Sequence, residues 1–177
     1  MGKTIVTLVN SGFLEGGAWD EEYEGIVSGW ALALALLKLY VELYFGSPKS
    51  TLLLVQPAAF EYPRLAPLFS TAEGLSSWLA SRVEMGPPGT ACAFVFDDGV
   101  TLNGRVLAAS RREVACSWPE LDGAFELKAF RTGEGRVVGL RITSWGRGDT
   151  WKAAARARFT PALERLARRL AAEGATS

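Results

Sequence analysis

Alternation of apolar and polar residues dominates the middle of the chain. Runs with this two-residue period lie at residues 82–85, 90–96, 101–110, 114–118, 124–131 and 136–145, and short turns such as Asp97-Asp98-Gly99 separate them. Strands joined by such turns pair as antiparallel hairpins. Two further runs that are rich in β-branched or aliphatic residues, at residues 4–9 and 50–56, predict strands ahead of this group.

Apolar positions spaced three and four residues apart predict two long helices, over residues 19–44 and 149–172. The second has one apolar face with arginines opposite, so it can lie across the concave side of a curved sheet. The first is apolar nearly all round and must be covered on more than one side. Two short helices are expected between them, over residues 62–69 and after Ser70, which has capping-box spacing with Glu73. Asp149 is the expected N-cap of the last helix.

A strand-plus-helix pattern occurs twice along the chain. Residues 9–11 and the helix after them correspond to residues 142–144 and the last helix, at a spacing of 133 residues (142 − 9). The intervening strands occur once. We therefore expect residues 1–46 to resemble the C-terminal end of a preceding domain and residues 47–177 to form a complete domain. The predicted class is α+β: a helix-grip fold, in which a curved antiparallel sheet wraps a long C-terminal helix, plus an extra N-terminal strand-helix unit.

The first copy of this pattern carries a family resemblance. Its sequence, TIVTLVNSGFLEGGAWDEEYEGIVSGWALALALLKLYVELYFG, resembles the closing strand and helix of the SRPBCC (START-like) superfamily, in the group homologous to the activator of heat-shock protein 90 ATPase. Residues 69–75 with Trp78 look like the two short helices of that group, and residues 104–106 with 116–118 look like its central hairpin. The second copy lacks the phenylalanine after SxG. The first has no front half, so either the chain is the C-terminal portion of a tandem protein or its first strand and helix have no barrel of their own.

The residue types restrict the chemistry. The 177 residues include no histidine, which excludes histidine-dependent nucleophile systems, imidazole acid/base catalysis and histidine metal sites. Cys92 and Cys116 lie in alternating apolar stretches and are expected to be buried strand residues, too few for a thiolate metal cage. The sequence also lacks a phosphate-binding glycine loop and a nucleophile elbow. We expect a protein that is not an enzyme and that holds neither metal nor cofactor.

The 19 basic and 19 acidic residues are distributed unevenly. Residues 128–177 carry 11 Lys or Arg against 4 Asp or Glu, a net charge of +7. Neither interleaved aromatics nor a groove-reading motif accompanies this charge, so no nucleic-acid binding is expected. The apolar run at residues 30–45 contains Lys38 and Glu42 and is shorter than the ~20 residues of a membrane span, and residues 1–9 lack a secretory signal pattern. A cytoplasmic protein that does not enter a membrane is expected.

A helix-grip fold encloses an elongated space between helix and sheet, and ligand cavities of this kind are mostly apolar with a few polar groups. The apolar residues expected to line it are Trp78, Phe94, Phe96, Trp118, Phe125, Leu127, Trp145, Trp151 and Phe159. The same inward pattern also fits a solid core without a ligand. Acid/base chemistry there would need a carboxylate or a tyrosine with a shifted pKa, for which the candidates are Glu84, Glu126 and Tyr62.

Two functions of different classes remain open. One is a non-catalytic module that binds an apolar small molecule in the helix-grip cavity. The other, which the resemblance implies, is a co-chaperone-like protein-interaction domain of the stress response; a cyclase- or hydratase-type enzyme, as found elsewhere in the superfamily, is a third reading. We also expect a homodimer formed through the N-terminal strand and helix, because a large apolar patch and an unpaired strand edge are rare on a monomer. The alternative is that this segment folds back onto its own domain as an extra layer.

Overall fold

The computed structural model describes residues 5–12, 17–133 and 135–174, with side chains over 5–12, 23–133 and 135–172. In these residues one antiparallel sheet has the strand order β1-β7-β6-β5-β4-β3-β2. Every strand predicted within 50–145 is present, with ends that match to within one residue. Their bounds are β1 (Lys49–Pro57), β2 (Arg82–Met85), β3 (Ala91–Val95), β4 (Thr101–Ala109), β5 (Glu113–Trp118), β6 (Gly123–Thr132) and β7 (Gly135–Trp145).

The helices also follow the prediction. They are α1 (Gly17–Leu39), which continues as the π-helical turn η1 (Tyr40–Tyr44), then α2 (Tyr62–Ser70), α3 (Ala72–Ser76), the 3₁₀ turn η2 (Pro119–Leu121) and α4 (Lys152–Gly174). Two caps differ from expectation. Asp149 is not the N-cap of α4, because the helix begins at Lys152 and the Asp149 carboxylate accepts the Ser50 hydroxyl. The Thr71 hydroxyl oxygen accepts the Gly74 amide at 2.9 Å, whereas Ser70 donates its hydroxyl to the carbonyl of Ala66. Thr71 is the residue with extended backbone before α3, so its side chain reaches the free amide.

The inner face of the sheet carries the main core. Phe125 and Leu127 of β6 point to the same side as Leu140 of β7, and all three are buried. α4 packs on this face, with α2 and α3 closing it, and contributes the buried side chains Phe159, Leu163, Leu166 and Leu170. This packing is the helix-grip arrangement that the sequence predicts.

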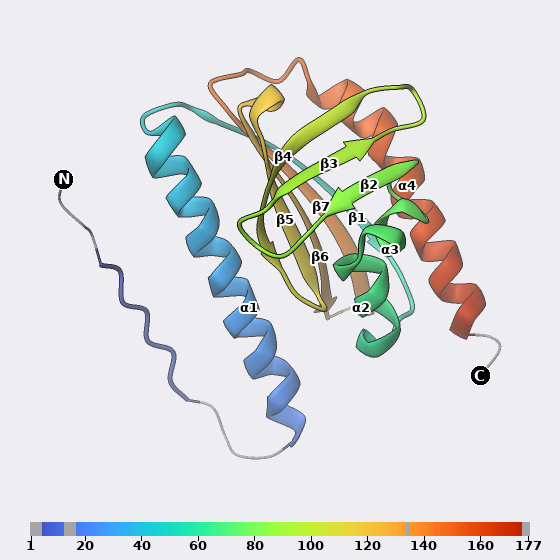
Figure 1. Cartoon of the computed structure of the whole chain (residues 1–177). Helices are drawn as coiled ribbons and strands as arrows, with labels where there is room; N and C mark the ends of the chain where they lie inside the picture. The colour runs from blue at the N-terminus through green and yellow to red at the C-terminus, as the bar shows by residue number, and fades with distance from the viewer. Residues whose placement is uncertain (1–4, 13–16, 134, 175–177) are drawn as a thin grey trace.

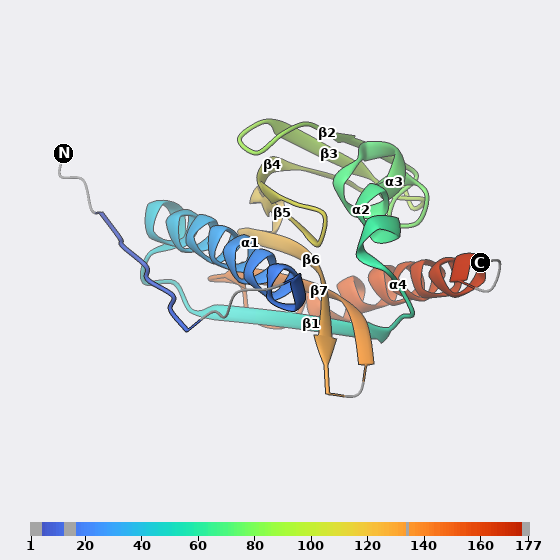
Figure 2. The same ribbon diagram turned by 90° about the horizontal axis from the view of Figure 1, so that it is seen from below.

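The outer face of the sheet is covered by α1. A small second core here joins Leu39 to Ala124 of β6 and Trp145 of β7, with Tyr40 and Tyr44 packed against it. Figures 1 and 2 show α1 and α4 on opposite sides of the sheet, so the domain has three layers. The helix therefore lies on its own domain as an extra layer. This position is the alternative expected from the sequence beside a homodimer formed through this segment.

The strand predicted over residues 4–9 is not formed in the part that the structure describes. Residues 5–12 run beside α1 without strand pairing (Figure 1), and Ile5 and Val9 are 88% and 82% exposed. A β-rich sequence becomes a strand only when a neighbouring strand supplies hydrogen-bond partners. The described sheet ends at β1 and β2, and neither edge pairs with this segment. Thr4 lies outside the described residues.

Among the residues that the structure describes, one helix, over Tyr23–Tyr44, is long and apolar enough to span a membrane by length and composition alone, with a mean hydropathy of 1.7. It is longer than the apolar run at residues 30–45. Core helices of soluble proteins meet the same criterion, but they are mostly buried, whereas only 11% of this apolar window is buried. The expectation that the chain does not enter a membrane stays a prediction.

Candidate functional site

The helix-grip interior is filled by aromatic rings in mutual contact. The ring centroid of Trp118 lies 5.5 Å from that of Phe125 and 6.0 Å from that of Phe159. Phe94 contacts Phe125 at 5.1 Å, and Phe96 contacts Phe159 at 5.5 Å. The other candidates that belong to this core or pack against it are Tyr62, Trp78, Leu127 and Trp151. These contacts are those of a packed interior, and a ligand role for these residues stays a prediction.

Three of the predicted cavity residues lie elsewhere. Glu126 is buried on the outer face, where it accepts hydrogen bonds from Nε of Arg141 at 2.7 Å and from Nη2 of the same guanidinium. Trp145 is also on the outer face, with its ring stacked on Tyr44 at 4.9 Å. Glu84 is exposed on β2. The reason is strand alternation: Phe125 faces inward, so Glu126 next to it faces outward.

Cys92 and Cys116 are free and buried, as predicted. A hydrogen bond between the two side chains lowers the pKa of the Cys92 thiol, while the same bond and burial raise the pKa of Cys116. Nucleophilic cysteines require an accessible thiolate. Cys92 and Cys116 are both buried and are hydrogen-bonded to each other, so neither provides an accessible thiolate. Over the described residues, no group of three or more Asp, Glu or Cys side chains gathers closely enough to hold a metal ion.

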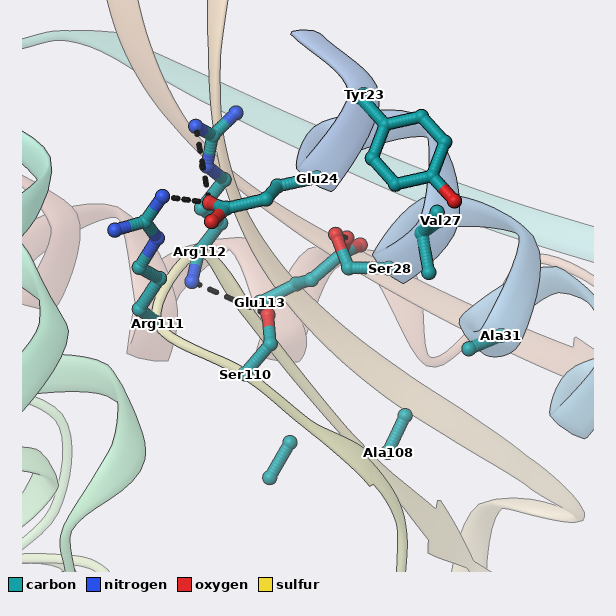
Figure 3. A pocket seen from close by; sticks show the side chains of 11 residues that line it. Tyr23, Glu24, Val27, Ser28, Ala31, Ala108, Ser110, Arg111, Arg112 and Glu113 are labelled. Carbon is teal, nitrogen blue, oxygen red and sulfur yellow. Dashed lines mark hydrogen bonds and ion pairs between the residues drawn. The ribbon is translucent and has the colours of Figure 1, made fainter. Parts of the chain in front are cut away.

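A different cavity lies between α1 and the turn that joins β4 to β5, with a volume of about 480 Å³. Figure 3 shows its polar groups, Glu24, Arg111 and Arg112, gathered at one end and Ala31 and Ala108 at the other. The alternation and helical spacing in the sequence do not predict this site.

Two glycines bring α1 close to the sheet beside this cavity. A Cβ atom on Gly25 would lie 2.9 Å from Nη1 of Arg112, and one on Gly29 would lie 3.3 Å from Nζ of Lys128. Larger residues would therefore push these cationic side chains aside or lift the helix. The sequence signal was present as small residues at positions 25, 28 and 29, which share one side of the helix.

Glu113 is the acidic centre of the site and is only 2% exposed. Its Oε1 accepts the Ser28 hydroxyl at 2.5 Å, and its Oε2 lies 3.4 Å from Nζ of Lys128 without making a hydrogen bond. This contact ties the middle of α1 to the start of β5. The buried carboxylate is thus compensated by one lysine and one hydroxyl.

Arg112 is the basic centre and is 7% exposed. The face of its guanidinium lies over the ring of Tyr62, with Cζ 3.9 Å from the centroid. Its Nη2 is 3.9 Å from Oε2 of Glu24, an oxygen that is also paired with Arg111. Nε and Nη2 of Arg112 have no hydrogen-bond acceptor. Two guanidinium groups therefore share one exposed carboxylate.

No family model matches the chain, and no curated protein matches it. Solved structures do resemble it. The Aha1 dimer from Colwellia psychrerythraea is 15% identical, with a TM-score of 0.58 over 68% of this chain and 96% of that one. Protein NE0264 from Nitrosomonas europaea is 13% identical, with a TM-score of 0.56 over 70% and 95%. Protein MLL2253 from Mesorhizobium loti is 18% identical, with a TM-score of 0.55 over 70% and 98%.

The chain has a helix-grip fold. At these identities the likeness concerns the fold alone. Each match spans nearly all of the other protein and leaves close to a third of this chain outside it.

Proposed function

We propose that this chain is a non-catalytic, cytoplasmic protein-interaction module that forms a homodimer through its N-terminal layer. The observation that carries the proposal is the side of α1 and η1 that the sheet does not cover. It presents a stripe of large apolar side chains, each between 41% and 53% exposed. This α1 outer stripe consists of Tyr23, Val27, Trp30, Leu37 and Val41. A patch of this kind marks an interaction surface on a soluble protein.

The neighbouring segment adds to this apolar surface. Leu8 and Val9 line a shallow cavity together with Ile26, Trp30 and Leu34 of α1, so the two elements lie side by side. On β1, Leu53 and Val55 are also exposed. The outer edge of β1 has no neighbouring strand among the described residues. The surface therefore combines apolar side chains with unpaired strand backbone, which together favour a protein partner over solvent.

The internal repeat supports a second copy as that partner. In the complete domain, Ile142 of β7 pairs with Leu52 of β1, and α4 packs against β1. Residues 9–11 and α1 correspond in sequence to that part of β7 and to α4. They therefore have the pattern of a segment that pairs with a strand like β1. The free edge of β1 in a second chain offers such a strand. Reciprocal pairing of residues 9–11 with that edge, with α1 remaining on its own domain, satisfies both copies. The Aha1 protein from Colwellia psychrerythraea was itself solved as a dimer.

Binding of an apolar small molecule in the helix-grip interior has less support, because aromatic rings occupy that space. A chaperone, which the family resemblance implies, would also need an exposed apolar surface. A second copy of the chain and a chaperone are distinguished as partners by whether the purified chain associates with itself.

The test is light scattering after size exclusion at micromolar concentration. We expect the mass of two chains for the wild type and of one chain for Trp30→Glu, which places a charge in the centre of the α1 outer stripe. Val100→Glu, at an exposed apolar position in the turn between β3 and β4, is the matched control and should stay dimeric. The thermal midpoint of the wild type should rise by about 2 °C for each tenfold increase in concentration.

A mass of one chain for the wild type would contradict the proposal. The same chain should then be mixed with phospholipid vesicles and floated in a density gradient. Flotation that Trp30→Glu abolishes would assign the stripe to a membrane instead.

A further inference from the structure

We infer that the cavity between α1 and the β4–β5 turn binds a small amphipathic carboxylic acid, with its carboxylate at Arg111 and Arg112 and its apolar body against α1 and β4. This site is separate from the helix-grip interior. It shares Tyr23 and Val27 with the α1 outer stripe, but its charged and apolar groups all come from one chain.

Among the side chains that the structure describes at the site, one cation is uncompensated. Arg111, Arg112 and Lys128 stand against two carboxylates, Glu24 and Glu113, a balance of +1. Glu113 is matched by Lys128 and hydrogen-bonded by Ser28, so it offers little to a ligand. Glu24 is about half exposed and is shared between both arginines. An anion is therefore the charge that completes the site.

Arg112 defines the form of that anion. It is more than nine-tenths buried, and its Nε and Nη2 both lack an acceptor. A buried cation whose donors are unsatisfied is costly, and a ligand oxygen that reaches them removes that cost. Nε and Nη2 stand side by side on a guanidinium and match the two oxygens of a carboxylate. Stacking on Tyr62 holds the guanidinium plane in position.

The rest of the cavity is apolar. Its walls are Val27 and Ala31 from α1 and Ala108 and Ala109 from β4, and Figure 3 shows the two helix residues facing the strand across the opening. The volume of about 480 Å³ lies within the range of small-molecule sites. The small side chains leave room for a hydrocarbon or aromatic body that continues from the cationic end.

Isothermal titration calorimetry with decanoate tests the inference, with decylammonium and decanol as probes of equal length. We expect one decanoate per chain and at least tenfold weaker binding of the other two. Failure of decanoate to bind, or equal binding of decylammonium, would overturn the inference.

Two pairs of variants locate the site. Arg112→Met should weaken decanoate binding at least tenfold, whereas Arg156→Met, at an exposed arginine of α4, should not change it. Ala31→Phe fills the apolar end and should abolish binding, whereas the same change at exposed Ala33 should not. If Arg112→Met fails to fold, the comparison of Ala31→Phe with Ala33→Phe still tests whether decanoate binds in this cavity. Decanoate that binds Ala31→Phe as it binds the wild type would place the ligand elsewhere and refute the assignment.

Trp30→Glu separates this site from the dimer. The variant should bind decanoate with wild-type affinity whether or not it has lost its partner, because Trp30 does not line the cavity. Loss of binding in Trp30→Glu would show that the site needs two chains and would refute the single-chain assignment.

Discussion

The two long helices, α1 and α4, each span 23 residues and lie on opposite faces of the same sheet, yet they are buried very differently. α4 places Phe159, Leu163 and Leu166 in the main core, each no more than 2% exposed. Among the described side chains of α1, only Leu32 and Leu39 are buried. The helix with the lower overall hydrophobicity is thus the one that is better buried.

The difference lies in what each face of the sheet offers. The inner face presents large apolar side chains, and α4 meets them with one apolar side while its arginines bond outward: Arg158 donates to Asp98 at 2.6 Å. The outer face presents ion pairs, and α1 meets them with glycine and serine. A helix that uses its small residues against a polar face keeps its large apolar ones for another surface. Burial therefore follows the pattern of a helix and the face opposite it, not its mean hydropathy.

The largest effect should come from the contact between α4 and the inner face. Leu166→Ala leaves a cavity in a fully buried position and should lower the free energy of unfolding by about 2–5 kcal/mol in urea denaturation. Leu37→Ala in α1 is the matched change at a half-exposed position. It should cost less than about 0.5 kcal/mol in the monomeric Trp30→Glu background. Equal costs at the two positions would mean that the helices are equally buried in solution.

An intermediate effect should come from the outer face. Arg141→Met leaves the carboxylate of Glu126, which is 3% exposed, without its hydrogen-bonded cation. We expect a loss of about 3 kcal/mol, at the lower end for a broken buried pair because the Arg141 side chain is itself 44% exposed. Arg82→Met breaks the exposed pair with Glu84 and should cost less than about 1 kcal/mol in the same urea titration. A cost for Arg141→Met no larger than that for Arg82→Met would show that the outer face tolerates a lone charge.

The smallest effect should appear at the start of α4. Hydrogen bonds from Lys152 and Ser50 lower the pKa of the Asp149 carboxyl, and the Ser50 contact joins the helix start to β1 at 2.6 Å. Because the folded-state pKa is depressed, the contribution of Asp149 is present above its unfolded pKa of about 4 and is lost as the pH falls through the folded value. Asp149→Asn should therefore reduce stability at pH 6 but not near pH 2. A wild-type advantage that persists at pH 2 would refute this linkage.

Most of the fold is predictable from local pattern. The strands between residues 50 and 145 alternate strictly and are joined by short turns, so their pairing follows from chain order. Residues 5–9 have the same β-rich pattern, but a strand also depends on a neighbour, and a one-dimensional pattern does not contain that neighbour. The position of α1 likewise depends on which face of the sheet is free to receive it, and the sequence of the helix does not contain that face.

The candidate site was harder to predict because its residues do not look functional. Arg111 and Arg112 follow Ser110 at the end of a strand, where charged residues normally meet solvent. The burial of Arg112 and Glu113 depends on α1, which is about 85 residues away in the sequence, as the Ser28–Glu113 contact shows. Alternation alone would have placed Glu126 outside, because Phe125 and Leu127 on either side of it face inward. It would not have shown that α1 covers that side.

Different interactions hold the N-terminal part of α1 and its continuation η1 against the sheet. Near Glu24 and Ser28 the helix is held by charge and hydrogen bonds, whereas near Tyr44 it is held by ring stacking on Trp145. Salt screens the exposed ion pair between Glu24 and Arg111 but has little effect on the buried Ser28–Glu113 hydrogen bond or on the ring stacking. Rising ionic strength should therefore loosen the first turns of α1, near Glu24, while the ring stacking keeps η1 on the sheet. Amide hydrogen exchange would record this as a gradient along α1, steepest where the cavity opens.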